Sequence, residues 1–382
     1  MTRRVIAAAL LLLAIGMSQT TVATASPREL AAGGSPGSAA PVWAYYYIWF
    51  DPSSWDRAKT DYSLLGRYSS DDSTVMRQHV AMAKAAGVSG FLVSWKDTST
   101  LTPRLERLVE IAREEGFSLG IVYQGLDFAR EPISIEKVRH DLEMVADRYE
   151  HDPVFSHFGK PVVVWTGTSK FTRDQVRYAV EPVTGRLDVL ASAGDPADYE
   201  SIADLVHGNA HYWSSVNPEK PWYAARMQEM AEAVHAHHGL WVAPAAPGFD
   251  ARLVGGASVV PRRGAQTLQQ ELAVAAGSDA DLIGLISWNE FSENSHVEPS
   301  LTYGATALEA VADFVGSDPG TALSIDSSGT RTSYAGLDGW GAVAVTTVLL
   351  VGTVALVRRS RRRAAAGTTS PGRRSQPRGS AS

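Results

Sequence analysis

The chain has 382 residues, of which 45% are hydrophobic and 20% charged, with no cysteine and a formal net charge of −6. These values exclude a disordered chain, disulfide cross-links, thiolate zinc sites and a cysteine nucleophile. The charge is unevenly divided, because residues 358–382 hold eight arginines and no acid, and Arg3 and Arg4 lie at the other end. Removing these ten from the 35 Lys and Arg leaves 25 against 41 Asp and Glu, so the middle carries about −16. Such a body argues against nucleic acid or an anionic polymer as the ligand.

The first segment predicts a signal peptide over residues 1–25. Two arginines precede an apolar run over residues 5–17, and the small residues Ala23 and Ala25 stand two apart before the expected cleavage position. The alternative is a buried N-terminal helix, but this helix would be apolar on all sides and would need protein partners around it. Residues 26–40 are small and turn-forming, so they are predicted to form a flexible linker.

Between residues 41 and 316, short apolar runs alternate with stretches of helical character. Eight runs have the length of a strand buried on both faces: Val42–Phe50, Gly90–Lys96, Leu119–Gln124, Pro161–Gly167, Asp188–Gly194, Leu205–Trp213, Leu240–Pro247 and Leu282–Glu290. The expected helices are Ser73–Ala86, Pro103–Glu115, Ser134–Tyr149, Arg173–Val180, Trp222–His238, Gln266–Ala276 and Ala305–Phe314. Only the connection between the fifth and sixth runs is weak.

This alternation predicts an α/β fold, a (β/α)8 TIM barrel over residues 41–316. Gly87, Gly116 and Gly239 stand where helix C-caps are expected, each just before a strand. A doubly wound sheet is the alternative, but no glycine-rich phosphate loop follows the first strand.

The C-terminal part predicts a single membrane anchor. Residues 317–338, rich in Ser, Gly, Thr and Asp, are interpreted as a stalk, and residues 339–357 contain no charged residue. At about 1.5 Å per residue, the second segment is long enough to cross a bilayer core. The arginines of residues 358–382 then match the positive-inside rule. A buried helix and a cleaved sorting signal are the alternatives. We expect a single-pass protein of a bacterial envelope, with its body extracellular and its basic tail cytoplasmic.

Acidic residues follow the predicted strands at the end where barrel enzymes carry their chemistry. They are Asp51, Asp97, Asp127, Asp195, Asp250, Glu290 and Glu293. The sharpest pattern is the last, in which a strand runs into Trp288-Asn289-Glu290 and Glu293 follows three residues later. Two carboxylates at one strand end can divide acid and base roles, one ionised and the other held protonated. Capping of a helix N-terminus is the alternative role for such acids.

Aromatic residues gather near the same strand ends. They are Tyr45–Tyr47, Trp49 and Phe50 on the first strand, Trp95 on the second, Tyr123 on the third, and Tyr212 and Trp213 on the sixth. Sugar rings present apolar C–H faces, so aromatic side chains beside carboxylates favour carbohydrate binding. Alternate residues of the first strand must instead belong to the barrel core.

Metal and serine chemistry have weaker patterns. His235, His237 and His238 lie at a helix end, and alternate positions on a helix do not share a face. His207 and His211 could both point inward from a strand, but no third ligand is evident. No Gly-x-Ser-x-Gly elbow supports a Ser-His-Asp triad. We therefore predict no metal and no cofactor.

Five segments, in this order, resemble glycoside hydrolase family 99, the endo-α-mannosidases and endo-α-mannanases. They are Tyr45–Phe50, Gly87–Phe91, Gly159–Pro161, Pro247–Asp250 and Trp288–Glu293. The resemblance covers residues 42–305 and implies a retaining endo-glycosidase that cleaves α-mannosides. It implies that Glu290 deprotonates the sugar's own 2-hydroxyl to give a 1,2-anhydro sugar. Glu293 would protonate the leaving oxygen and later activate water.

The chain departs from the family pattern at two places. Ser292–Ser295 stands where His-Glu-Gly-Thr is usual, and Gln124 replaces a substrate-contacting Glu unless Asp127 takes that role. The residues expected to contact substrate are Tyr46, Tyr47, Trp49, Trp95, Tyr123, Gln124, Asp127, Tyr212, Asp250, Asn289 and His296. A monomer acting on a polysaccharide or other glycan is expected. A glycosidase for another sugar or linkage, a non-catalytic carbohydrate-binding barrel and a metal-dependent hydrolase are the alternatives.

Overall fold

The computed structural model of the protein describes residues 40–127 and 129–320. The predicted signal peptide, membrane helix and basic tail, with nearly all of the linker and stalk, lie outside these residues. Within the described ranges, no helix is both long enough and apolar enough to cross a membrane.

Eight parallel strands form one sheet in the order β5-β4-β3-β2-β1-β10-β7-β6. Their bounds are β1 Val42–Tyr47, β2 Val88–Trp95, β3 Ser118–Gln124, β4 Val162–Thr166, β5 Asp188–Leu190, β6 Gly208–Ala210, β7 Leu240–Ala245 and β10 Leu282–Leu285. The two edge strands meet where Ala191 bridges Asn209 and the His207 N–H donates to the Val189 carbonyl at 2.8 Å. The sheet therefore curls into a barrel, and the predicted barrel fold is confirmed.

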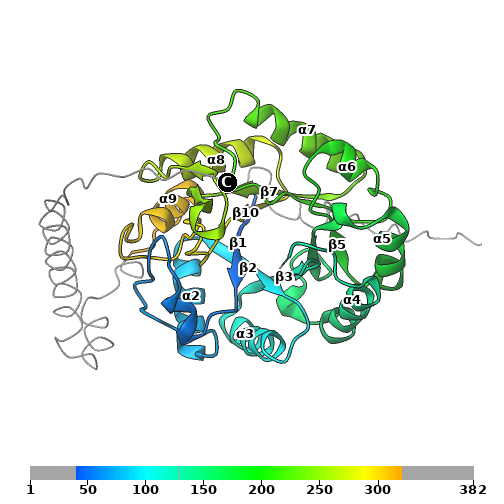
Figure 1. Ribbon diagram of the computed structural model, residues 1–382, viewed down its shortest axis with the longest axis horizontal. Helices are drawn as coiled ribbons and strands as arrows, with labels where there is room; N and C mark the ends of the chain where they lie inside the picture. The colour runs from blue at the N-terminus through cyan, green and yellow to red at the C-terminus, as the bar shows by residue number, and fades with distance from the viewer. Residues whose placement is uncertain (1–39, 128, 321–382) are drawn as a thin grey trace, which may run out of the picture. The chain divides into compact units, whose positions relative to one another are not determined.

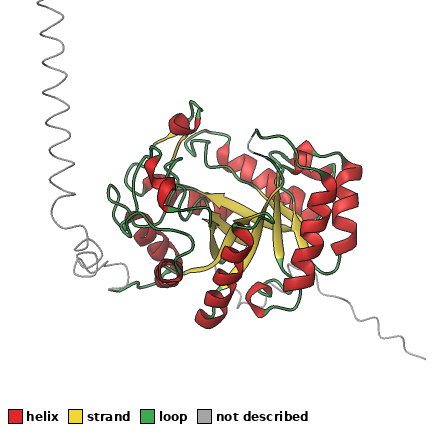
Figure 2. Ribbon diagram, turned by 60° about the horizontal axis from the view of Figure 1, so that its bottom comes forward, coloured by secondary structure: helices red, strands yellow, loops and turns green. Residues whose placement is uncertain are grey.

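Helices cover the outside of the strands in both views (Figures 1 and 2). The α-helices are α2 Ser73–Ala85, α3 Leu101–Glu115, α4 Ile135–Tyr149, α5 Arg173–Val180, α6 Pro196–Glu200, α7 Tyr223–Ala236, α8 Gln266–Gly277 and α9 Thr306–Val315. The 3-10 helices are η1 Pro52–Asp56, η2 Pro153–Phe155, η3 Thr168–Lys170, η4 Glu181–Val183 and η5 Ala251–Val254. All seven predicted helices are present, and the short α6 fills the weak connection.

One element has no counterpart in the sequence prediction. β8, Phe249–Asp250, and β9, Val259–Val260, form an antiparallel hairpin after β7. Two-residue strands are too short to show a period in the sequence, so local pattern could not reveal them.

Two of the three predicted glycine C-caps are in the left-handed conformation that glycine favours. Gly116 has φ 61° and Gly87 has φ 76°. The third prediction is wrong, because His238 takes the left-handed position with φ 57°. Gly239 is needed for space instead, since a Cβ there would lie 2.9 Å from the Gly208 Cα atom and from the Tyr199 hydroxyl.

The period of two along β1 divides its side chains between two apolar layers. Trp43 and Tyr45 pack inside the barrel. Val42, Ala44 and Tyr46 pack outside, between the barrel and the helices. Tyr47 at the end of β1 therefore belongs to the inward-facing set, which places it at the mouth formed by the carboxyl ends of the strands.

The described chain begins and ends at the opposite end of the barrel from this mouth. Residue 40 precedes the start of β1, and α9 ends with Val315 beside Gly87, just before the start of β2. Just after α9, the Ser317 hydroxyl donates to the Ala85 carbonyl at the C-terminal end of α2, at 3.4 Å.

Candidate active site

The segment after β10 folds back on itself and carries both candidate carboxylates. Its start is tied to β1, because the Trp288 N–H donates to the Tyr45 carbonyl at 2.7 Å. The Ser287 N–H donates to the Ser295 carbonyl at 2.7 Å, which closes the segment into a loop. Glu290 and Glu293 lie on this closed loop, called the acidic loop below (residues 287–296), at the barrel mouth.

Glu290 is held in a nearly dry position, with its residue 8% exposed. Its Oε1 accepts the Ser292 N–H at 2.9 Å, and its own N–H donates to the Ser287 hydroxyl at 2.8 Å. Burial, reinforced by the negative charge of Glu293, raises the pKa of Glu290 to about 7. The ammonium of Lys59 acts in the opposite direction.

Glu293 is half-buried, and burial raises its pKa as well. The positive charge of Arg130, on the connection between β3 and α4, opposes that rise. Sequence reasoning missed both Arg130 and Lys59, because a basic residue in a strand-to-helix connection looks like any solvated surface charge.

Two tyrosines and a tryptophan form an aromatic wall beside the carboxylates. The Tyr47 and Tyr212 hydroxyls lie 2.7 Å apart, although Tyr47 ends β1 and Tyr212 follows β6. Trp49 stacks on Tyr47, with ring centroids 4.3 Å apart, and is 41% exposed. Burial, together with the charges of Glu290 and Glu293, raises the pKa of Tyr47 well above its usual value, so its hydroxyl stays protonated.

Asn289 fixes the acidic loop to the end of β1. Its Oδ1 accepts the Tyr47 N–H at 2.9 Å, and its Nδ2 donates to the Tyr47 carbonyl at 3.0 Å and to the Tyr68 hydroxyl at 3.2 Å. The side chain is fully buried and its hydrogen bonds go to the protein. Asn289 therefore positions Tyr47 and Glu290 relative to each other.

No protein-family model and no curated protein sequence matches the chain. Among solved structures, the family 99 endo-α-mannosidase of Bacteroides thetaiotaomicron bound to Bis-Tris-propane aligns with a TM-score of 0.62 and 20% identity, covering 74% of this chain and 98% of that one. A second structure of that enzyme gives 0.63 and 18%, with 72% and 96% covered. A glycoside hydrolase-like protein gives 0.58 and 14%, with 76% and 99% covered.

This chain has the fold of a family 99 endo-α-mannosidase. The resemblance expected from the sequence motifs is thus confirmed for the fold. The two carboxylates lie at the mouth of that barrel.

Three predicted substrate contacts lie on the outer face of this family 99-like barrel, away from the mouth. The Tyr46 hydroxyl contacts Nδ1 of His79 on α2 at 2.9 Å. Trp95 Nε1 donates to Thr102 on α3 at 3.3 Å, and the Tyr123 hydroxyl donates to Asp141 on α4 at 2.9 Å. All three are buried in the layer between strands and helices. The sequence places these residues correctly near the strand ends. Their side chains, however, fall on the face of each strand that points out of the barrel.

His296 and Asp250 lie next to the acidic loop but face protein partners. His296 is buried against Phe291, and its Nε2 lies 3.5 Å from the Asp61 carboxylate. Burial lowers the pKa of His296 to about 4, so the ring is neutral near pH 7. The Asp250 carboxylate is paired with Arg252, while its N–H donates to the Glu293 carbonyl at 2.7 Å.

Gln124 ends the third strand as the sequence predicts, and Asp127 lies in the connection that follows. Gln124 is half-buried, and its Nε2 donates to the Ser94 hydroxyl at 2.9 Å. Asp127 is exposed, and its Oδ1 accepts the N–H groups of Ala129 and Glu131 at 2.8 and 2.9 Å. Asp127 therefore shapes the turn that carries Arg130.

The remaining strand-end acids serve local structure. Asp51 caps η1 and Asp195 caps α6 through their side chains. Asp97 accepts the Thr102 hydroxyl at 2.7 Å. In a barrel every strand end precedes a helix start, so capping acids collect at the mouth without taking part in its chemistry.

Among residues 40–127 and 129–320, no group of three or more His, Asp or Glu could hold a metal ion. His235 instead contacts Asp281 at 3.0 Å. Burial lowers the pKa values of His207 and His211.

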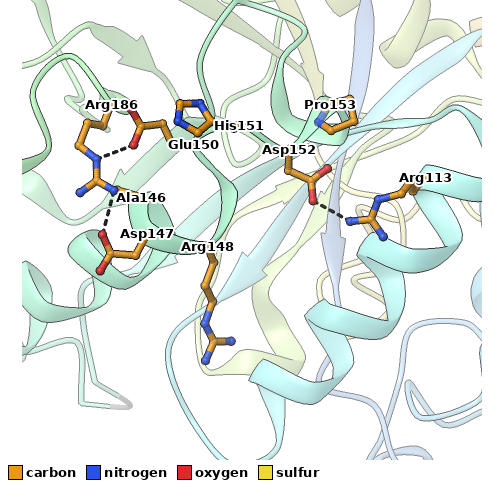
Figure 3. Close-up of a pocket in the computed structure, with 9 residues that line it drawn as sticks. All are labelled: Arg113, Ala146, Asp147, Arg148, Glu150, His151, Asp152, Pro153 and Arg186. Atoms are coloured by element: carbon orange, nitrogen blue, oxygen red, sulfur yellow. Dashed lines mark hydrogen bonds and ion pairs between the residues drawn. The ribbon is translucent and has the colours of Figure 1, made fainter.

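A cavity of about 720 Å³ lies away from the mouth, at the C-terminal ends of α3 and α4 (Figure 3). All three of its arginines already have acidic partners, which for Arg148 is Glu106. Arg113 donates to Asp152 at 2.7 Å, and Arg186 donates to Glu150 at 2.6 Å. These paired charges and the distance from Glu290 and Glu293 argue against the cavity as the reactive site.

Proposed function

We propose that the protein is a retaining endo-glycosidase that cleaves α-mannosidic linkages within a glycan. The observation that carries the proposal is the acidic loop, which presents Glu290 and Glu293 beside an aromatic wall at the mouth of a family 99-like barrel. Trp49, stacked on Tyr47 and partly exposed, offers a face for a sugar ring.

The proposed reaction has two steps. Glu290 takes the proton of the sugar's 2-hydroxyl while O2 attacks C1, and the bond from C1 to the leaving oxygen breaks as Glu293 protonates that oxygen. In the second step Glu293 takes a proton from water, whose oxygen attacks C1. The C1–O2 bond of the anhydro sugar then breaks, and O2 recovers its proton from Glu290. Two inversions at C1 give net retention.

The pKa values without substrate bear on these roles. Burial raises the pKa of Glu290 to about 7, so Glu290 is partly protonated near neutrality, whereas the proposed base must be ionised. A sugar 2-hydroxyl that donates a hydrogen bond to Glu290 favours the ionised form. A base with a pKa near the working pH also balances ionisation against basicity. We expect substrate binding to move the proton from Glu290 toward Glu293.

The substrate is proposed to differ from that of other family 99-like enzymes. Gln124 occupies the strand end where the resemblance expects a Glu, and its amide is engaged by Ser94. A neutral amide offers one uncharged acceptor oxygen, whereas a carboxylate offers two charged ones that can each accept from a neighbouring sugar hydroxyl. A glycosidase for another sugar or linkage is therefore the second candidate, and Gln124 is the observation that favours it.

We also propose that the enzyme is anchored to a bacterial cell membrane by residues 339–357, with the barrel outside and residues 358–382 inside. The apolar run and its arginines in the sequence support this proposal. The substrate would then be an envelope or environmental glycan.

The test is incubation of the protein with a panel of α-mannans and envelope glycans, followed by identification of the products. Oligosaccharide products of α-configuration would support a retaining endo-mannosidase. Release of monosaccharides alone, or inversion at C1, would contradict it. Activity confined to glycans without mannose would favour the second candidate. Efficient turnover of a 2-deoxy substrate would remove the anhydro-sugar route.

A further inference from the structure

A buried arginine, Arg262, contacts the acidic loop from the segment that follows β9. Its Nε donates to Asn294 Oδ1 at 3.2 Å, and its guanidinium also donates to the Asn294 carbonyl at 3.2 Å and to the His296 carbonyl at 2.6 Å. The guanidinium lies 4.2 Å from the centre of the Tyr303 ring. One side chain therefore holds both Asn294 and His296, which follow Glu293 in the acidic loop.

The hydrogen-bond acceptors of this arginine are uncharged amide and main-chain oxygens. Arg262 is 6% exposed, and burial lowers its pKa only to about 10, so it keeps its charge near pH 7. A buried cation bound this way is costly and is retained where its geometry is needed. The planar fork of arginine can reach several acceptors at once, which the single ammonium of lysine cannot reproduce.

The Pro247–Asp250 segment also contacts both Arg262 and the acidic loop, and its Gly248 leaves the space that Arg262 occupies. Gly248 has φ 156°, and a Cβ there would lie 2.7 Å from the Arg262 Cγ atom. Two residues later, the Asp250 N–H donates to the Glu293 carbonyl at 2.7 Å. The hairpin thus holds Glu293 on one side while Arg262 holds Asn294, whose φ is 53°, on the other.

We propose that Arg262 is a positioning residue for Glu293, with Gly248 providing the space it needs. This inference rests on the proposed function, in which Glu293 is the acid that protonates the leaving oxygen. Arg262 acts through the backbone of the acidic loop, so its loss displaces the acid while leaving the base, Glu290, in place.

The test compares Arg262→Lys and Gly248→Ala on two substrates, an α-mannan and an aryl α-mannoside whose leaving group needs little protonation. A misplaced acid slows only the reaction that needs the acid, and general acid catalysis is worth about 10²–10⁴ in rate. We expect kcat on the mannan to fall at least about tenfold further than kcat on the aryl mannoside, with KM little changed. Equal losses on both substrates would overturn the proposal.

Gly120→Ala is the matched control, because it crowds the barrel core at Leu92 and Trp43, far from the acidic loop. It should lower the melting temperature without separating the two substrates. Glu293→Gln, measured in parallel, tests the underlying function: if it shows no separation, Glu293 is not the acid and the proposed roles fail.

Hydrogen exchange of residues 293–296 gives a readout independent of activity. Arg262→Lys and Gly248→Ala should exchange faster there than the native protein, while Gly120→Ala should not. Unchanged exchange in both variants would overturn the positioning role even if the protein proved inactive on every glycan.

Discussion

At the scale of residues, Glu290 and Glu293 have identical side chains only three positions apart, yet their surroundings differ. Glu290 is buried and bound by the Ser292 N–H, whereas Glu293 is half-buried and lies near the charge of Arg130. These different surroundings allow the two carboxylates to differ in protonation, which is what acid–base catalysis by a pair requires.

The proposed roles predict different losses of activity when each glutamate is replaced by glutamine. Glu293→Gln should lose activity on natural glycans by about 10²–10⁴ but keep more on substrates with an activated leaving group. Glu290→Gln should lose activity on both, because no leaving group replaces removal of the 2-hydroxyl proton. Measurement of kcat/KM on both substrates checks this. If Glu290→Gln instead kept activity on the activated substrate and Glu293→Gln did not, Glu290 would be the acid and Glu293 the base.

The raised pKa of Glu290 also predicts a pH-dependent stability. Its value of about 7 lies above the ordinary 4.5, so the native state binds this proton more tightly than the unfolded chain. The resulting stability is complete below pH 4.5 and is lost as pH rises through 7. Glu290→Gln avoids that loss, so its advantage in unfolding free energy should grow to at most about 3 kcal/mol at pH 8.

Thermal unfolding of the native protein and Glu290→Gln between pH 4.5 and 8 measures this difference. Glu110→Gln, on the solvent face of α3, serves as the control and should show no such growth. A difference independent of pH would mean that Glu290 is not desolvated in the folded protein.

Residue-level prediction from the sequence put Glu290 and Glu293 at one strand end, and the structure has both on one loop, but the prediction failed for several of their neighbours. Tyr46 and Tyr47 are identical and adjacent, yet one contacts His79 outside the barrel and the other meets Tyr212 at the mouth. The sequence shows that one of them must point inward but does not show the register that decides which. Arg130 and Lys59 reach the carboxylates only through the path of their loops.

At the scale of elements, the amide of Asn289 joins the acidic loop to β1 by exchanging two hydrogen bonds with the main chain of Tyr47. A second asparagine does the same elsewhere. Asn209 on β6 accepts from the Ala193 N–H at 2.8 Å and donates to its carbonyl at 3.3 Å. The two clamps are chemically alike but hold different parts of the barrel.

This pair predicts that stability and activity will separate. Asn289→Ala and Asn209→Ala should each lower the unfolding free energy by about 2–3 kcal/mol, because both leave buried main-chain groups unpaired. Only Asn289→Ala should lower kcat well beyond the effect of Asn209→Ala, since it frees Glu290 and Tyr47 from each other. Denaturant unfolding and kcat give the two numbers. Equal effects on kcat would deny Asn289 a positioning role.

The elements themselves follow closely from local sequence. Runs of apolar residues predict all eight barrel strands, and helical stretches predict seven helices. In each case the spacing of apolar residues within the segment itself shows which positions are buried. The β8–β9 hairpin is held instead by contacts from Asp250 and Arg262 to the acidic loop, tens of residues away. Contacts of that range leave no periodic trace in either segment.

At the scale of the whole molecule, the barrel encloses its own core. The two large apolar layers are built from residues 40–314, inside and outside one ring of strands. Ring closure is thinnest between β5 and β6, which have three residues each.

This self-sufficiency predicts that residues 40–320 alone fold and keep full activity. The shortened chain should match the full protein in far-ultraviolet circular dichroism and in kcat/KM on a soluble glycan. A fall in kcat/KM without a change in the spectrum would show that the omitted segments contribute to the site.

Both ends of the described chain lie at the amino ends of the strands, so either can be tethered without obstructing the mouth. An enzyme immobilised on a bead by either end would present its catalytic loops to the surrounding fluid and could act on polymers too large to enter a porous resin. The same placement makes the barrel a natural choice for circular permutation, with a short linker joining the old ends and new ends opened in a mouth-distant loop.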